Sequence, residues 1–153
     1  MPRRPSSPRT PRPHASRSRT TPSRSALSPA APCPCGLGAP YGECCGIFHQ
    51  GRGAAPTAER LMRSRYSAFA VRDEDYLLRT WSAATRPPGV RFDEAIHWTG
   101  LDVLVTTGGS AFHSEGTVEF RARFRVRGTD GEQRENSRFV REGGLWVYVD
   151  AIG

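Results

Sequence analysis

All four cysteines of this 153-residue chain lie in one short stretch, CPCGLGAPYGECC. Two of the thiols stand one residue apart and two are adjacent, which places four soft ligands close together: Cys33, Cys35, Cys44 and Cys45. Thiolates at this density favour zinc over calcium or magnesium. Gly36 and Gly38 allow the positive φ angles that a tight metal-binding loop requires. The pattern predicts a structural zinc site, in which four thiolates leave no position for a catalytic water.

Other uses of these cysteines would require different surroundings. A disulfide framework is typical of small secreted domains, and no secretory signal precedes the stretch. An iron–sulfur cluster also takes four thiolates, but adjacent cysteines do not match its usual spacings. His49 follows Cys45 by four residues and would replace one thiolate as a ligand if the segment turned helical there. Free thiols are the remaining alternative.

Charge is distributed unevenly along the chain. Residues 1–31 contain seven arginines, no acidic residue and many prolines and serines, whereas the rest carries 15 arginines and all 15 acidic residues. A segment with so few large apolar groups cannot offset its ordering entropy, so we expect residues 1–31 to form a disordered basic tail. A transit peptide has a similar composition. Nucleic-acid binding is expected only weakly, through this tail. No apolar run is long enough to span a membrane, and we expect a cytoplasmic protein.

Two helices are predicted after the cysteine stretch. Apolar residues recur at helical spacing over positions 58–69, and Thr57 is placed to cap the helix N-terminus. Arg65 lies in the middle of this apolar stripe. Because a buried arginine needs a partner, we expect the sheet to supply a carboxylate. Asp73 is placed to cap a second helix, which the prolines at 86–88 are expected to end.

The second half of the chain predicts an antiparallel sheet. Strands are expected at 96–106 and at 117–127, where apolar and charged residues alternate strictly and the arginines face solvent or a second subunit. Tight turns at 128–131 and 143–144 would then fix the register of the following strands. The inner-face pairs in that register are Phe124 with Glu135, Ala122 with Ser137, Phe120 with Phe139, Phe139 with Tyr148, and Ser137 with Asp150.

Polar side chains gather on the inner face of this predicted sheet, opposite Arg65. One interpretation is an internal ion pair that fastens the helix to the sheet. The other is a pocket in which a desolvated carboxylate has a raised pKa and acts as a general base, with Arg65 or Tyr66 orienting the substrate. Structural networks perturb pKa values as readily as active sites do, so the ion pair is the preferred interpretation. The pocket residues would be Arg65, Tyr66, Glu135, Ser137 and Asp150.

The cysteine stretch resembles the SEC-C motif, a small zinc-binding element found at the end of the preprotein translocase ATPase SecA. The residues that carry this resemblance are Cys33, Cys35, Gly36, Gly38, Tyr41, Cys44, Cys45 and Gly46. The motif usually has serine where Leu37 stands, and its fourth ligand is Cys or His. The resemblance implies zinc as the cofactor, with Cys33, Cys35, Cys44 and Cys45 as its ligands.

Residues 33–150 as a whole resemble the YchJ-like family of bacterial proteins, through segments such as CPCGLG, TAERLMRSRYSAF, HWTGLDV and GTVEFRARFR. The central domain of that family is similar to the nuclear transport factor 2-like (NTF2-like) fold. In that fold, helices pack on a strongly bent antiparallel sheet and form a cone with a pocket. Cones of this type often pair through their outer sheet faces, so the resemblance also allows a homodimer.

We therefore expect an α+β protein in three parts: a tail over 1–31, a zinc knuckle with its linker over 32–53, and a cone domain over 54–153. A protein-interaction module is favoured over an enzyme, and the resemblance alone implies a partner in the ribosome or the secretion machinery. The alternative is a small-molecule enzyme, of isomerase, dehydratase or hydrolase type, with Glu135 or Asp150 as its base. An open cavity beside these carboxylates would favour the enzyme, whereas a packed salt bridge would close it.

Overall fold

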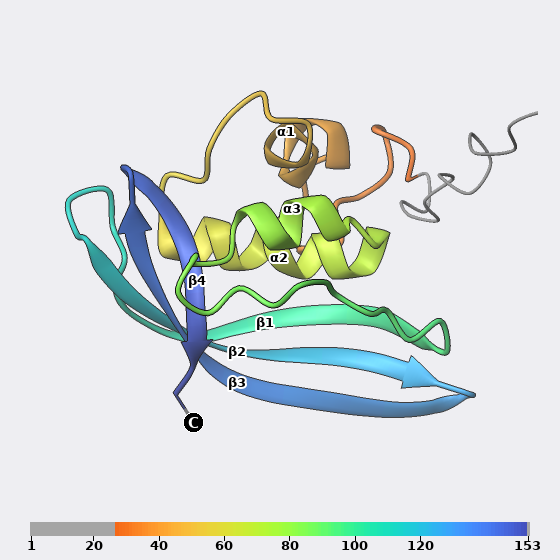
Figure 1. The fold of residues 1–153 in the computed structure, drawn as a ribbon. Helices are drawn as coiled ribbons and strands as arrows, with labels where there is room; N and C mark the ends of the chain where they lie inside the picture. The colour runs from red at the N-terminus through yellow and green to blue at the C-terminus, as the bar shows by residue number, and fades with distance from the viewer. Residues whose placement is uncertain (1–26, 153) are drawn as a thin grey trace, which may run out of the picture.

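The computed structural model describes residues 27–152, and in this part of the chain the helices precede a four-stranded antiparallel sheet (Figure 1). The tail predicted to be disordered lies outside the described residues as far as position 26. The helical segments are η2 (Tyr41–Glu43), α1 (Cys45–His49), α2 (Ala58–Val71) and α3 (Glu74–Arg79). The strands are β1 (Ile96–Gly108), β2 (Glu115–Val126), β3 (Thr129–Glu142) and β4 (Leu145–Ala151). The predicted α+β class is confirmed.

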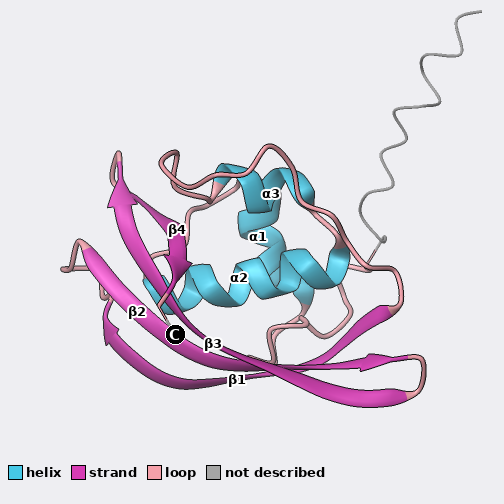
Figure 2. Ribbon diagram, turned by 60° about the horizontal axis from the view of Figure 1, so that its bottom comes forward, coloured by secondary structure: helices cyan, strands magenta, loops and turns pink. Residues whose placement is uncertain are grey.

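The sheet, with strand order β1-β2-β3-β4, bends around α2, and the helices lie on its concave side (Figures 1 and 2). Successive side chains of a strand point to opposite faces, so one face of each strand meets the helices. The core forms there, between four side chains of α2 and four of the sheet: Ala58, Leu61, Met62, Tyr66, Val118, Ala122, Phe139 and Trp146. This is the cone arrangement expected from the sequence.

Both predicted helix starts are confirmed. The Thr57 hydroxyl accepts a hydrogen bond from the Arg60 amide, and the Asp73 carboxylate accepts one from the Tyr76 amide, each at 3.1 Å. The predicted end of the second helix was wrong, because α3 stops at Arg79 rather than at the prolines. After α3 the chain pairs instead with β4, where the Ser82 amide donates to the Tyr148 carbonyl at 2.7 Å.

The predicted turn between β2 and β3 was also wrong. The strands are joined by the two residues Arg127 and Gly128, whose φ angles of 49° and 83° are those of the tight turn that best matches strand twist. Each β2 residue therefore pairs with a β3 residue that lies an even number of positions from the predicted one. Because side chains alternate between the faces, every side chain keeps its predicted face. The observed pairs are Val118 with Ser137, Phe120 with Glu135, Ala122 with Gln133, and Phe124 with Gly131.

The turn at Gly143–Gly144 and the pairing of Phe139 with Tyr148 are confirmed between β3 and β4. A bulge between Arg138 and Phe139 then shifts the register by one residue, so that Ser137 faces Ala151 and Asp150 faces Arg138. The Arg138 Nε donates to Asp150 Oδ1 at 3.1 Å. Asp150 consequently lies on the outer face, and its predicted place among the inner-face residues was wrong.

The outer face of the sheet carries arginines that are paired with neighbouring acidic residues, as predicted. The pairs join Arg121 and Arg123 to Asp102, Arg125 to Asp130, Arg134 to Glu119, and Arg138 to Asp150. These charges are half-buried or exposed and both signs are present, so the ion pairs balance the charge of this face. Among the described helices, none has both the length and the apolar character needed to cross a membrane.

Candidate functional site

The first pair of cysteines lies in a loop that folds back on itself. The Cys33 amide donates to the Ala39 carbonyl at 3.0 Å, and the Gly36 amide donates to the Cys33 carbonyl at 3.2 Å. Gly36 and Gly38 have φ angles of +82° and +91°, as predicted for a tight metal-binding loop. Before the loop, Ala31 accepts a hydrogen bond from the Tyr41 amide, so the ordered chain begins ahead of residue 32.

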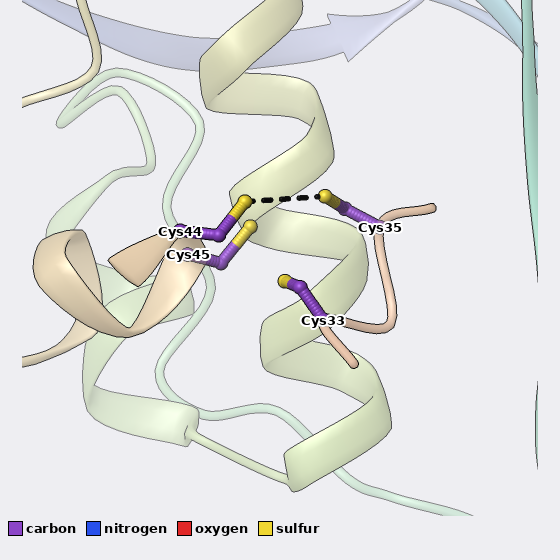
Figure 3. A group of neighbouring side chains, drawn as sticks. All are labelled: Cys33, Cys35, Cys44 and Cys45. Atoms are coloured by element: carbon purple, nitrogen blue, oxygen red, sulfur yellow. Dashed lines mark hydrogen bonds between the residues drawn. The ribbon is translucent and has the colours of Figure 1, made fainter. Parts of the chain in front are cut away.

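The second pair of cysteines lies where two short helical segments meet. Cys44 follows η2, and Cys45 is the first residue of α1. At the next position a side-chain Cβ would lie 2.6 Å from the Tyr41 carbonyl oxygen, so only glycine fits at Gly46. The two pairs of cysteines thus face each other across a small gap (Figure 3).

The four sulfurs form a buried cluster. All four Sγ atoms lie within 4.8 Å of one another, and Sγ of Cys35 lies 3.6 Å from Sγ of Cys44 (Figure 3). Sulfurs about 2.3 Å from a tetrahedral metal ion would be about 3.8 Å apart, so this spacing fits such an ion. The thiols are free rather than joined in disulfides. The exposed fractions of these four residues are 5% or less. The cluster can therefore hold a metal ion with all of its ligands from protein.

Hydrogen bonds among the thiols move their pKa values apart. Hydrogen bonding from the thiols of Cys35 and Cys45 holds the pKa of Cys33 far below its ordinary value. The same interaction raises the pKa of Cys35 to about 12, and it also raises the pKa of Cys45. A metal ion would supply the positive charge that deprotonates such coordinating thiols. The donor set therefore fits a metal that prefers thiolates.

His49 does not join the cluster. Its Nε2 lies 2.8 Å from the Ser64 carbonyl oxygen and must be the donor there, which leaves Nδ1 to accept from the Tyr41 hydroxyl at 2.5 Å. With both ring nitrogens occupied, the histidine connects α1 to α2 instead of replacing a thiolate. The predicted alternative with His49 as a ligand is not what the structure shows.

The knuckle packs on one side of α2. Oγ of Ser67 lies 3.6 Å from Sγ of Cys33, and Nη1 of Arg63 donates to the Cys35 carbonyl at 2.9 Å. From α3, Nη2 of Arg79 donates to the Phe48 carbonyl at 2.9 Å. The cysteine cluster is thus built onto the helices that cover the cone.

A cavity of about 300 Å³ lies on the other side of α2, between this helix and the sheet. Its wall is mainly aromatic and aliphatic, and a few polar groups project into it. The lining residues are Met62, Arg65, Tyr66, Phe69, Trp81, Trp98, Phe120, Ala122, Gln133, Glu135, Ser137, Phe139 and Tyr148. Four of the five predicted pocket residues are among them, and Asp150 is not.

Arg65 is the buried cation of this cavity, with 6% of its surface exposed. Its guanidinium lies over the rings of Trp81 and Tyr148, at 4.9 and 4.7 Å from their centroids. Nη1 donates to the Leu77 carbonyl and to the Thr80 hydroxyl, both at 2.7 Å. Burial lowers the pKa of Arg65 to about 10. Within the described residues no carboxylate pairs with it, so the predicted ion pair between helix and sheet is not formed.

Glu135 is the acidic group of the cavity. One of its oxygens, Oε2, accepts from the Ser137 hydroxyl at 2.5 Å and from the Tyr148 hydroxyl at 3.5 Å. Tyr66 lines the opposite wall, where its ring meets the edge of Trp98 at 5.9 Å between centroids. Burial raises the pKa of Tyr66 to about 12. The cavity therefore extends to its carboxylate and is not closed by a salt bridge, which is the arrangement expected for the small-molecule alternative.

Sequence reasoning missed the aromatic frame of the cavity. The sequence predicts a helix through Trp81, whereas α3 ends before this residue, and it indicates no role for Trp98. It predicts Tyr148 on the inner face of the sheet but not in a pocket. The usable signal was periodicity, because Tyr148 follows Trp146 by two positions and continues the inward-facing alternation of β4.

Comparison with known proteins identifies the two parts of the molecule. Residues 57–151 match the family described as "YchJ, middle NTF2-like domain", and residues 31–47 match the SEC-C motif. The chain belongs to the YchJ family. A relative within it, a UPF0225 protein of Streptomyces avermitilis, is 57% identical over 134 residues, which cover 88% of this chain and 93% of that protein.

Two solved structures share the YchJ-family fold. The solution structure of a SEC-C motif containing protein from Rhodopseudomonas palustris has a TM-score of 0.69 and 34% identity, covering 80% of this chain and 98% of that one. The crystal structure of a SEC-C motif containing protein from Psychrobacter arcticus has a TM-score of 0.67 and 27% identity, covering 82% and 84%. The knuckle and the cone are thus a recurring pair.

Proposed function

We propose that this protein binds a small molecule in the cone cavity and that a structural zinc ion holds together the knuckle that packs on the cone. The observation that carries the proposal is the cavity itself, about 300 Å³ in volume and lined mainly by apolar side chains around a few polar groups. Small-molecule sites have this composition and begin at this size, about 300 to 1,000 Å³.

Zinc is the metal that the knuckle suits best. Four buried sulfurs at tetrahedral spacing are the ligand set of structural zinc sites, and they leave no position for a water or substrate. The ion would hold the loop, η2 and α1 together in a segment too short to bury a core of its own. Its role is therefore structural.

Metal analysis of the purified full-length protein tests this assignment. We expect one zinc per chain, lost in Cys44→Ser and in Cys45→Ser. Ser67→Ala is the matched control, because it removes a hydroxyl beside Cys33 and leaves every thiol in place. Reduced, metal-replete protein that contains no zinc would overturn the zinc assignment.

Binding of indole, a neutral apolar probe, tests the cavity. We expect NMR contacts between indole protons and the Met62 methyl group, and loss of binding in Ala122→Phe, which fills the cavity from the sheet side. Ala84→Phe, in an exposed loop, is the control. Indole contacts scattered over the surface of the wild-type protein would refute the proposal, whether or not the filled variant folds.

The protein partner implied by the resemblance to SecA stays a prediction, and so do the homodimer and weak nucleic-acid binding by the tail. The knuckle surface supports such a partner through Leu37, which lies in the cysteine loop with 44% of its surface exposed. A pull-down with the Leu37→Ser variant, against wild type, would test whether this surface docks a protein.

A further inference from the structure

We infer that the ligand of the cone cavity is a small carboxylic acid with an apolar body and a hydroxyl or amino group, its carboxylate bound by Arg65 and its hydrogen-bond donor by Glu135. The inference rests on the proposed ligand-binding function and names the chemical class of the ligand. It follows from how the two charged groups of the cavity are held, from what each has left to offer, and from the wall between them.

The first observation is a buried cation that forms no direct ion pair among the described residues, since Glu135 acts on Arg65 only through space. A buried charge is strongly disfavoured unless an opposite charge or hydrogen bonds compensate it. On the outer face of the sheet, arginines and carboxylates meet directly, as Arg138 and Asp150 do at 3.1 Å. In the cavity, by contrast, Arg65 and Glu135 form no ion pair, although both line the same space. Arg65 keeps its charge at neutral pH, because its pKa falls only to about 10.

The second observation is the free edge of the Arg65 guanidinium. The rings of Trp81 and Tyr148 lie against the guanidinium, and its Nη1 is used by Leu77 and Thr80. Nε and Nη2 donate to no group in the part of the chain that the structure describes. A guanidinium fixed in this way, with donors to spare, matches the planar geometry of a carboxylate.

The third observation concerns Glu135. Both of its hydrogen bonds, from Ser137 and from Tyr148, fall on Oε2. Among the described residues Oε1 accepts no hydrogen bond, so this oxygen can receive one from a ligand. A hydroxyl or an ammonium group would supply the donor, which a plain hydrocarbon acid would lack.

The wall between the two charged groups determines which kind of apolar group the ligand can carry. Tyr66, Trp98, Phe120 and Phe139 present ring faces and edges, with Met62 beside them. Such a wall favours an aromatic ring or a short branched chain over a sugar or a phosphate-rich molecule. A ring-bearing hydroxy or amino acid combines the three features.

Four probes, three of them of matched shape, test this class by NMR titration of the full-length protein at neutral pH. Phenyllactate carries the ring, the carboxylate and the hydroxyl. Phenylpropanoate lacks the hydroxyl, and phenylpropanamide also lacks the negative charge. Indole has neither the carboxylate nor the hydroxyl. We expect phenyllactate to bind more tightly than phenylpropanoate, and phenylpropanoate to bind about tenfold or more tightly than the amide, because a hydrogen-bonded charge pair contributes that much.

Substitutions assign each preference to its residue. Arg65→Met should bind phenylpropanoate and its amide equally, whereas Arg65→Lys should retain part of the preference for the acid. Glu135→Gln should lose most of the preference for phenyllactate over phenylpropanoate. Arg138→Met and Glu119→Gln make the same changes on the outer face and should behave as wild type. If Arg65→Met does not fold, the wild-type and Arg65→Lys titrations decide the question.

The outcomes separate the class of ligand from the existence of a ligand site. Binding of indole and the amide in the cavity, with no gain for either acid, would overturn the carboxylic-acid class and leave the ligand site standing. A preference for acids that survives in Arg65→Met, or is lost equally in Arg138→Met, would overturn the role of Arg65. Failure of all four probes to contact the cavity would refute the proposed function itself.

Discussion

The guanidinium of Arg65 lies 4.7 Å from the centre of the Tyr148 ring, and this contact joins α2 to β4. The indole of Trp81 meets the same tyrosine edge-on at 5.2 Å, so the segment that follows α3 joins the same cluster. One buried cation and two rings thus hold α2 and this segment to the C-terminal strand. The polar end of the cavity is therefore fixed before any ligand arrives, which reduces the ordering that binding requires.

The two candidate sites share α2. Arg63 and Ser67 of this helix contact the knuckle, whereas Met62, Arg65 and Tyr66 line the cavity. Side chains three or four positions apart lie on one face of a helix. The residues that contact the knuckle and those that line the cavity therefore occupy different faces of α2. The cysteine cluster thus packs against the helix that forms one wall of the cavity.

Removal of the metal should therefore weaken the cone as well as the knuckle. We expect a strong zinc chelator to lower the free energy of unfolding by about 3 kcal/mol and the melting temperature by roughly 10 °C. Differential scanning calorimetry on the full-length protein measures both, and re-addition of zinc should restore them. An unchanged melting temperature after verified zinc loss would contradict the structural role.

The turn between β2 and β3 contains a residue that fits its backbone poorly. Arg127 has a φ of 49°, a left-handed conformation that asparagine tolerates better than arginine, and Gly128 follows it. We expect Arg127→Asn to raise the free energy of unfolding by about 0.5 to 1 kcal/mol in urea. Arg127→Ala also removes the arginine side chain, but alanine does not share the tolerance of asparagine for left-handed φ. This variant should therefore not raise the free energy of unfolding. Equal stability of the two variants would show that the backbone is not the cause.

The architecture was predictable because local signals agreed with one another. Helical spacing over 58–69 with a cap at Thr57, and strict alternation in β2, each point to a single element type. The cysteine spacing likewise identified all four candidate metal ligands. The turn at Arg127–Gly128 was missed because arginine is not a residue expected at positive φ. The error left the faces intact, since the shift was even.

The position of Asp150 was not predictable from the sequence. It depends on a bulge at Arg138–Phe139, and no glycine or proline marks that bulge. A one-residue slip moves a side chain to the opposite face, so the predicted inner carboxylate became an outer one. The aromatic frame around Arg65 was missed for a related reason, because the pairing of the chain after α3 with β4 is a tertiary contact.

Alkaline pH should unfold the protein through its buried tyrosines. Burial raises the pKa of Tyr66, Tyr76 and Tyr148 to about 12 each, from an ordinary value of 10.0. The unfolded chain releases these protons near pH 10, so their contribution to stability is fully present below pH 10 and is lost as pH rises toward 12. The lowered pKa of Arg65 has the opposite effect on stability, because the folded protein releases this proton at lower pH than the unfolded chain does. The three tyrosines outweigh this one arginine.

Ultraviolet absorbance of the phenolate measures this effect. We expect Tyr66, Tyr76 and Tyr148 to ionise near pH 12 in the folded protein and all four tyrosines of the chain to ionise near pH 10 in urea. Tyr76→Phe should remove one of the late ionisations and leave the others. Ionisation of all four tyrosines near pH 10 in the folded protein would contradict the burial seen in the cone.

The knuckle should fail when Gly46 is replaced, although this residue is not a metal ligand. A Cβ at that position would lie 2.6 Å from the carbonyl oxygen of Tyr41, which is backbone and cannot move without displacing η2. We expect Gly46→Ala to lower zinc content to less than half of one ion per chain and to melt as the chelated protein does. Gly89→Ala is the control, because its Cβ would meet only a carboxylate oxygen of Glu74 at 3.5 Å. Full zinc content with wild-type melting in Gly46→Ala would show that η2 and α1 tolerate displacement, and that the thiols alone determine metal binding.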